Sequence, residues 1–400
     1  MKHDNGGATG RFSLPAGVWV LGCGSLFMDT SSEMIHSILP VFMASVLGAS
    51  MITIGVIEGV AEATAAVTKV FSGALSDYLR RRKAVLVFGY ALAALTKPVF
   101  PLATSIGWVF GARFVDRIGK GIRGAPRDAM VADITPPAMR GAAYGLRQAL
   151  DSVGAFLGPL AAMLLMILLA ENIRQVMWVA VIPAFITVLL LLVFLREPEH
   201  VSGAVRAPLS FAEVKRLPPH FWLVVLLGAV FTLARFSEAF LVLRAQNVGL
   251  TLKYVPVVMV VMNVVYAGFA YPAGIAADRM SRRALLLFGL ALLVAADLVL
   301  AAAATPAPAL VGAGLWGLHM AFTQGLLSKL VADNAPTALR GTAFGIFNLS
   351  SGLALLLASV IAGALWTEVG PAATFIAGAA FAALGAIGLI AGGMRPERNH

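Results

Sequence analysis

The sequence has few charged residues for its length. Only 12% of its 400 residues are Asp, Glu, Lys or Arg, whereas soluble domains carry about 25%. A soluble globule of this size needs more polar side chains to cover its surface, so the composition excludes an ordinary soluble enzyme and a disordered chain. Hydrophobic residues make up 59% of the sequence and the mean hydropathy is +0.87. These values predict a polytopic membrane protein.

The sequence also lacks the residue patterns of several functional classes. Its one cysteine, Cys23, excludes a disulfide framework and a cysteine zinc site. It contains no Walker-type phosphate loop, no metal-ligand cluster, and no Ser/His/Asp arrangement that the spans would bring together. We therefore expect no enzyme activity, no metal and no cofactor.

The apolar runs are long enough to cross a bilayer. A helix needs about 20 apolar residues for this, and open sheets cannot lie in lipid. The sequence therefore predicts an all-α membrane protein with twelve transmembrane helices, at 16–47, 51–76, 84–103, 106–133, 138–166, 175–195, 220–248, 252–277, 284–303, 308–334, 336–367 and 371–393.

A polar connection divides the twelve spans into six and six. We expect an N-terminal half at 1–195, a linker at 196–219 that is too short to fold by itself, and a C-terminal half at 220–400. An internal repeat supports this division, because Pro136–Gly145 recurs as Pro336–Gly345, 200 residues later. Six spans are an even number, so both halves enter the membrane from the same side and form parallel repeats.

Basic residues outside the spans give the orientation. Nearly all of them fall on the side that holds both termini and the linker, and only Arg174, Arg244 and Lys253 fall on the other side. Cytoplasmic loops carry an excess of Lys and Arg. We therefore expect both termini in the cytoplasm, a location in the bacterial inner membrane, and no nucleic-acid partner despite the formal net charge of +10.

Charged residues also lie inside the spans, where each costs roughly 2.5–3.5 kcal/mol on insertion scales. Acids and bases balance there, which indicates pairing around a wet central cavity. The acids are Asp29, Glu33, Glu58, Glu62, Asp116, Asp151, Glu238 and Asp297, and the bases are Lys69, Lys97, Arg113, Arg117, Lys120, Arg123, Arg147 and Arg235.

The first span carries a polar stripe. Asp29, Glu33 and His36 follow one another at spacings of four and three, which places them on one helical face. The two carboxylates repel each other, so at least one is expected to accept a proton near neutral pH and could carry it across the membrane. The alternative is a structural ion pair with the span at 106–133 or 138–166.

The span at 106–133 is strongly basic, with Arg113, Asp116, Arg117 and Lys120 close together. These cations could hold an anionic substrate or act as counter-charges to a carboxylate.

Two further sets of polar residues lie in the C-terminal half. Arg235 and Glu238 are spaced as a local pair, at i and i+3. His319, like His36, could either titrate near pH 6.5 or pack as a hydrogen-bonded residue.

Taken together, these features resemble the major facilitator superfamily over nearly the whole chain. Gly73–Lys83 is similar to the family's Gly-x-Leu-Ala-Asp-Arg-x-Gly-Arg-Arg/Lys motif, and Gly274–Arg283 is its second copy. The family's second Gly is replaced by Arg80 and Ser281. The resemblance implies a gating role for six residues: Gly73, Asp77, Arg81, Gly274, Asp278 and Arg282.

Two weaker motifs bear on coupling and direction. Arg117, Lys120 and Gly121 resemble the family's Arg-x-x-Gln-Gly motif, which the family links to proton transfer, with Lys120 in place of Gln. The set Gly145, Gly154, Gly158 and Pro159 matches the Gly-x8-Gly-x3-Gly-Pro spacing found mainly in proton-exchanging exporters, although the usual final Gly is Ala162.

The sequence therefore predicts a monomeric, proton-coupled secondary transporter that exports a small molecule by alternating access. An importer of a small organic anion or metal chelate, driven by proton symport, is the alternative. A membrane receptor that binds without transport is disfavoured, because neither the linker nor the tail supplies an output module.

Overall fold

The computed structural model describes residues 14–79, 81–197, 214–336 and 339–391. These residues form helices joined by short connections, and within them there is no β-strand. The all-helical architecture expected from the composition is therefore confirmed.

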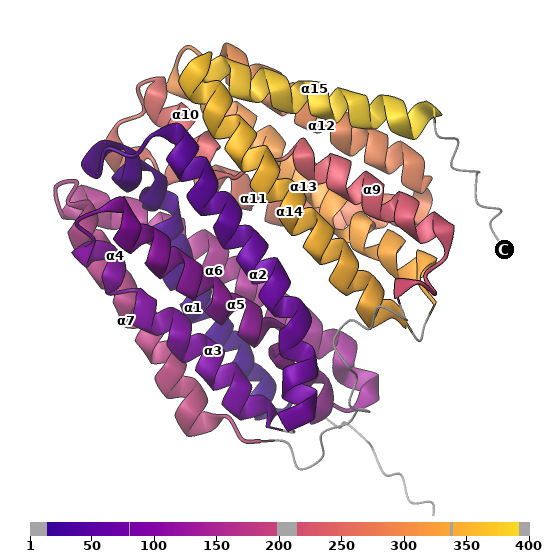
Figure 1. The fold of residues 1–400 in the computed structure, drawn as a ribbon. Coiled ribbons are helices and arrows are strands. Elements are labelled where there is room, and N and C mark those ends of the chain that lie inside the picture. Colours follow the sequence, from indigo (N-terminus) through magenta and orange to yellow (C-terminus); the bar gives the residue numbers. More distant parts are fainter. Residues whose placement is uncertain (1–13, 80, 198–213, 337–338, 392–400) are drawn as a thin grey trace, which may run out of the picture.

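Figure 1 shows the helices in two groups, the earlier part of the chain in indigo to magenta and the later part in red to yellow. The first bundle consists of α1 (Ala16–Val41), α2 (Met51–Leu79), α3 (Arg82–Thr96), α4 (Val99–Leu102), α5 (Ile106–Ile134), α6 (Arg140–Leu168) and α7 (Ile173–Phe194). The second bundle consists of α9 (Pro219–Leu233), α10 (Ala239–Asn247), α11 (Val257–Arg279), α12 (Arg282–Ala302), α13 (Pro306–Asn334), α14 (Arg340–Glu368) and α15 (Pro371–Ala391).

Nine of the helices within the described ranges are long and apolar enough to cross a membrane. The spans expected at 16–47, 106–133 and 220–248 are not among them. The second of these corresponds to α5, in which charged residues recur along most of the helix. The other expected spans coincide with observed helices to within a few residues.

The expectation of one continuous helix over 220–248 is wrong, because α9 ends at Leu233 and α10 begins at Ala239. The break contains neither Gly nor Pro, so its cause is tertiary packing. The Ser237 N–H donates to Ser359 Oγ at 3.2 Å instead of to a carbonyl of its own helix. The Phe236 ring lies 5.3 Å from the Trp316 ring and 5.4 Å from the Phe375 ring, between centroids.

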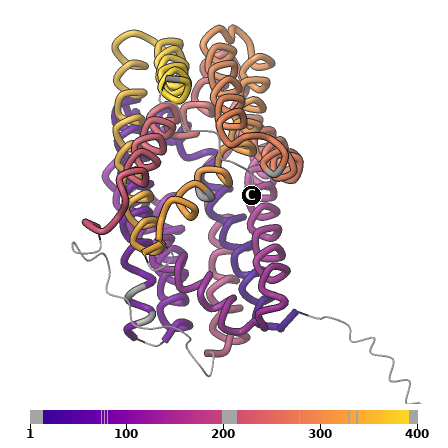
Figure 2. Tube along the Cα trace, turned by 90° about the vertical axis from the view of Figure 1, so that its right-hand side faces the viewer, coloured from indigo at the N-terminus to yellow at the C-terminus, as the bar shows by residue number. Residues whose placement is uncertain are grey.

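The two bundles meet through α2 and α14. A Cβ atom on Gly59 would lie 2.8 Å from the Leu356 backbone, and one on Gly352 would lie 2.9 Å from Ala66 Cβ. A Cβ on Gly363 would collide with the backbone of Met51. These approaches extend from the middle of both helices to the parts that are farthest from the end where α7 leads into the linker. We call the end where α7 leads into the linker the linker end and the opposite one the remote end. Figure 2 views the molecule from the side of the second bundle, whose orange to yellow helices lie in front of the first bundle.

Candidate functional site

A cavity of about 540 Å³ lies between the two bundles, on the linker side of the α2–α14 contact. This volume falls within the usual range for small-molecule sites. The charged residues of its wall all come from the first bundle: Asp29, Glu33, Glu62, Lys69, Lys120, Arg123, Arg127 and Asp151. The second bundle contributes neutral polar side chains, which are Asn263, Tyr266, Gln324 and Asn348.

A second cavity of about 380 Å³ continues the first toward the second bundle. The two share Glu62, Ala66, Gln324 and Asn348. The smaller one adds Arg235, which lies in the break between α9 and α10. The pair of cavities therefore reaches from the charged wall of the first bundle to the broken helix of the second.

Two glycines of α6 allow α1 to lie close to it. A Cβ atom on Gly154 would lie 2.7 Å from Leu26 O, and one on Gly158 would lie 2.7 Å from Glu33 Cβ. Because no side chain separates the two helices there, Asp29 and Glu33 can lie at the edge of the cavity. Gly145 has nothing within 4 Å of the same position, so this residue of the predicted motif makes no such contact.

Pro159, the remaining motif residue, lies inside α6 directly after Gly158. A proline at this position has no N–H to donate to the preceding turn.

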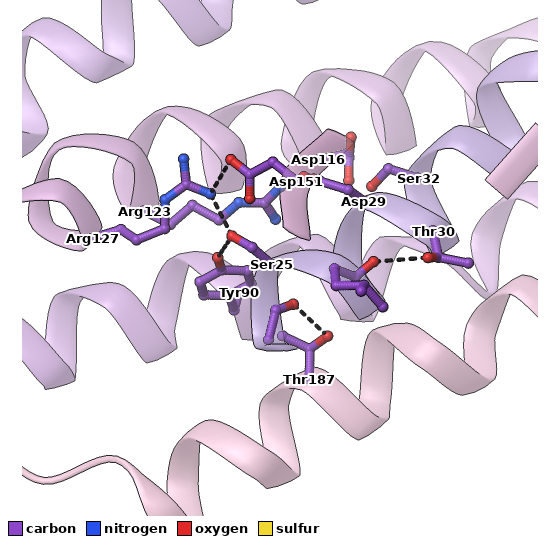
Figure 3. A network of polar contacts seen from close by, with 12 residues as sticks. Ser25, Asp29, Thr30, Ser32, Tyr90, Asp116, Arg123, Arg127, Asp151 and Thr187 are labelled. Carbon is purple, nitrogen blue, oxygen red and sulfur yellow. Dashed lines mark hydrogen bonds and ion pairs between the residues drawn. The ribbon is translucent and has the colours of Figure 1, made fainter. Parts of the chain in front are cut away.

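Asp29 faces a group of basic and polar side chains, shown in Figure 3. Its Oδ1 lies 3.6 Å from Arg123 Nη2, and the Arg123 guanidinium lies 4.5 Å from the centroid of the Tyr90 ring. The Asp29 side chain remains 25% exposed, whereas that of Arg123 is 6% exposed. Asp29 is thus an accessible carboxylate with one loosely placed cationic partner.

The neighbouring acid, Asp151, is bound more tightly. Its Oδ2 accepts a hydrogen bond from Arg147 Nη1 at 2.7 Å and lies 3.5 Å from Arg127 Nη1. Arg127 also donates to Ser25 Oγ, which lies 3.1 Å from Tyr90 Oη. Arg147 and Asp151, four residues apart in α6, therefore form an ion pair.

Glu33 begins a chain of contacts that leads from the cavity into the first bundle. Glu33 Oε2 lies 3.3 Å from His36 Nδ1, and His36 Nε2 lies 3.6 Å from Glu58 Oε2. Arg113 Nη2 donates to the same Glu58 oxygen at 2.6 Å. Glu58 and Arg113 are almost completely buried between α2 and α5, so only the Glu33 end of the chain meets the cavity.

The structure places most of the basic cluster of α5 behind the cavity wall. Arg113, Asp116 and Arg117 are each at most 4% exposed. Asp116 pairs with Lys97 at 2.9 Å, and Arg117 pairs with Glu62 at 3.0 Å. These residues therefore serve as counter-charges, while Lys120 reaches the cavity.

The predicted site residues of the second bundle are dispersed. His319 is fully buried, its Nδ1 lies 2.7 Å from the Gly289 carbonyl of α12, and it lines neither cavity. The expected pair between Arg235 and Glu238 is not formed. Both residues are described, and no salt bridge joins them within 4.0 Å. The i,i+3 geometry of a continuous helix is lost because both residues lie in the break between α9 and α10.

The gating motif is described only in part, because the side chains of Asp77 and Asp278 lie outside the described residues. Gly73 approaches Ala125 of α5, at 3.3 Å from a Cβ built on the glycine, and Gly274 has nothing within 4 Å.

Both copies of the gating motif contain an arginine that forms an ion pair with an aspartate at the end of a neighbouring helix. Arg82 of α3 pairs with Asp133 at the end of α5, and Arg282 of α12 pairs with Asp333 at the end of α13, at 2.9 Å. Arg82 thus makes the ion pair that corresponds to that of Arg282. The gating role of Arg81, which occupies the same motif position as Arg282, stays a prediction.

Ion pairing is confined within the bundles. In the described parts of the chain, every salt bridge joins two residues of the same bundle. The same parts contain no group of three or more His, Cys, Asp or Glu residues that could hold a metal ion.

Sequence reasoning did not assign site roles to several residues that line the cavity. These are Glu62, Lys69, Arg123, Arg127 and Asp151. All but Arg127, which falls near the end of its span, had been recognised as charges within apolar spans. Which of them face the cavity depends on helix rotation, and the spacing within one helix does not give that rotation.

Comparisons with known proteins agree with this architecture. The sequence model of the Major Facilitator Superfamily matches residues 21–245 and 239–400. An uncharacterized MFS-type transporter of Methanocaldococcus jannaschii is 32% identical over 385 residues, which cover 94% of this chain and 95% of that protein. The inner membrane transport protein YajR of Escherichia coli is 25% identical over 92% of this chain and 81% of its own length.

Solved structures show the same fold. The nucleoside transporter NupG superposes with a TM-score of 0.76 at 15% identity, covering 94% of this chain and 99% of that one. A POT family transporter in complex with 5-aminolevulinic acid gives a TM-score of 0.78 at 14% identity, covering 95% and 96%.

Proposed function

Because the chain belongs to the major facilitator superfamily, we propose that it exports a small molecule across a membrane in exchange for protons. The two bundles, 1–195 and 220–400 with the linker 196–219 between them, rock around the central cavity and expose it to each side in turn. The contact of α2 with α14 closes the remote end, and the cavity lies on the linker side. This arrangement is an inward-facing state if the linker and both termini are cytoplasmic.

The observation that carries the proposal is the position of Asp29 and Glu33. Both line the cavity on one face of α1, and their side chains are 25% and 22% exposed. An ionisable group inside a membrane span that water can reach is suited to carrying a proton. Gly154 and Gly158 keep α6 close to this face, which gives the glycine motif a physical role next to the proton site.

In the proposed cycle, the carboxylate is ionised when substrate enters from the cytoplasm. Ionised Asp29 is stabilised by Arg123, and ionised Glu33 by His36. Protonation from the outside removes the negative charge and frees the cationic partner, so the charge of the cavity wall differs between the loading and the release stages of the cycle. The counter-charges Arg113, Asp116 and Arg117 keep the surrounding wall electrically balanced. The gating residues lie near the linker end and control its closure: Gly73, Asp77, Arg81, Gly274, Asp278 and Arg282, together with Arg82, which pairs with Asp133.

The remaining features of the proposal follow from the same topology. We assign the protein to the bacterial inner membrane as a monomer, and we assign it transport without enzymatic turnover. Import by proton symport remains the competing direction, and the experiment below separates the two.

The test uses inside-out vesicles with an acid interior, in which a pH-sensitive dye reports the proton gradient. A panel of drug-like cations, organic anions and metal chelates is added to vesicles containing the wild type, Asp29→Asn or Glu33→Gln. Asp297→Asn is the matched control, because this carboxyl is fully buried and lines neither cavity.

A compound that collapses the gradient in the wild type and the control, but not in one cavity variant, supports proton-coupled export. A compound-dependent leak that survives both cavity variants contradicts the assigned coupling site. If the proton movement requires the opposite gradient, the direction is import.

A further inference from the structure

We propose that the substrate is a small hydrophilic organic anion whose carboxylate or phosphate is held between Lys120 of the first bundle and Arg235 of the second. This inference rests on the proposed transport function and assigns a substrate class to the same cavity.

The carboxylates of the larger cavity are all partnered. Asp29 lies 3.6 Å from Arg123, Glu33 lies 3.3 Å from His36, Glu62 lies 3.0 Å from Arg117, and Asp151 lies 2.7 Å from Arg147. Each of these negative charges therefore has a cationic partner in the first bundle.

Three cations that line the cavities have no such partner. Among the described residues, Lys69, Lys120 and Arg235 form no salt bridge within 4.0 Å. Glu238, the remaining acid near the helix break, lies outside the lining of both cavities. The connected space therefore has an excess of available positive charge, which an anion can neutralise.

The broken helix makes Arg235 suited to this role. It lies between the end of α9 at Leu233 and the start of α10 at Ala239, where a continuous helix would otherwise pass. Breaks of this kind form substrate sites near the middle of transporter folds. The planar guanidinium can bind a carboxylate or phosphate through two parallel hydrogen bonds, and the Lys120 ammonium adds a compact charge from the other wall.

The rest of the lining indicates a polar substrate. The second bundle faces the larger cavity with Asn263, Tyr266, Gln324 and Asn348, and the first bundle contributes small residues such as Ala65. Tyr266 donates to Gln324 Oε1 at 3.2 Å, so amide and hydroxyl groups are already arranged to exchange hydrogen bonds. Such a wall fits hydroxyl-bearing anions better than lipophilic drugs.

The first test measures the cavity charge without requiring the substrate. A cysteine is introduced as Ala65→Cys in full-length protein from which the free Cys23 has been removed by Cys23→Ala. Its reaction rates with a negatively charged sulfonate and a positively charged trimethylammonium methanethiosulfonate are compared, each relative to a free thiol. Ala267→Cys places a second reporter on the other wall.

We expect the sulfonate reagent to react about tenfold faster than the ammonium reagent, since uncompensated positive charge in the cavity attracts the first reagent and repels the second. Lys120→Gln combined with Arg235→Gln should remove the preference. Lys253→Gln combined with Arg279→Gln removes the same charge outside both cavities and should leave it unchanged. Equal rates, a preference for the ammonium reagent, or an equal effect of the control pair would overturn the inference.

The second test measures thermal stabilisation of the full chain by four sugars of one scaffold: glucuronate, glucose 6-phosphate, glucose and glucosamine. A ligand that binds the folded state raises its melting temperature. We expect stabilisation by one of the acids that is lost in Lys120→Gln and in Arg235→Gln. Stronger stabilisation by glucose or glucosamine would overturn the inference. Neither test involves protons or turnover, so its failure is distinguishable from failure of the vesicle experiment.

Discussion

The buried pair of Glu58 and Arg113 offers a quantitative test of how the first bundle holds its charges. Arg113 Nη2 lies 2.6 Å from Glu58 Oε2, and the two side chains are 4% and 1% exposed. One helical turn away, Arg117 and Glu62 pair at 3.0 Å, but the Glu62 side chain is 32% exposed to the cavity. The two pairs join the same helices, α2 and α5, and differ mainly in access to water.

The difference in burial determines how much stability each pair is expected to contribute. Two unit charges about 4 Å apart attract each other by about 4 kcal/mol at an effective dielectric constant of 20. Removing one member of a buried pair leaves an uncompensated charge and costs about 3–5 kcal/mol. Arg113→Gln should therefore lower the free energy of unfolding by this amount, reduced somewhat by His36 at 3.6 Å from Glu58. Arg117→Gln should cost about 1 kcal/mol, because water can solvate Glu62.

The assay is a double-mutant cycle on the purified full-length protein, unfolded in mixed micelles of increasing SDS content. Glu58→Gln, Arg113→Gln and the double variant give the coupling energy of the buried pair, which we expect to be about 2–4 kcal/mol. Glu62→Gln, Arg117→Gln and their double variant give that of the cavity pair, expected below about 1 kcal/mol. Additive losses at the buried pair, or equal coupling at both pairs, would refute the reasoning.

Two further predictions concern packing. Gly158→Ala should destabilise the protein by about 1–3 kcal/mol relative to Gly145→Ala. Both variants gain helix propensity, but only the new Cβ at position 158 collides with Glu33. Equal melting temperatures of the two variants would contradict the close contact between α1 and α6. Asp297→Leu should raise the free energy of unfolding by about 1–3 kcal/mol, because it removes two fully buried oxygens without hydrogen-bond partners. A loss of stability in the same SDS titration would mean that the carboxyl has a structural role.

The sequence predicted most of the helices well because most spans are long apolar runs with their own local signal. It also placed Asp29 and Glu33 on one face of α1, since their spacing matches the helical repeat. The Arg147–Asp151 pair could be predicted for the same reason. These features depend only on residues within one helix.

The features that sequence reasoning missed depend on contacts between helices. The break before α10 has no Gly or Pro to signal it, and it is stabilised by Ser359 and by the rings around Phe236. His319 and Glu58 lie in similarly apolar spans, yet one packs against α12 and the other continues the chain of contacts from the cavity. Sequence reasoning also missed Arg82, whose ion pair with Asp133 corresponds to that of Arg282 with Asp333 in the second bundle.

The confinement of ion pairs within the bundles has a consequence for the energy barrier of rocking. Opening the remote end separates α2 from α14 at glycine–backbone contacts and breaks neutral hydrogen bonds such as Gln246 to Ser45 and Asn263 to Ala155. No opposite charges of the described residues need to be pulled apart in low dielectric. The rate at which the two conformations interconvert should therefore depend little on ionic strength. The charges of the first bundle move together as one preassembled unit, and only a proton or a charged ligand can alter their balance.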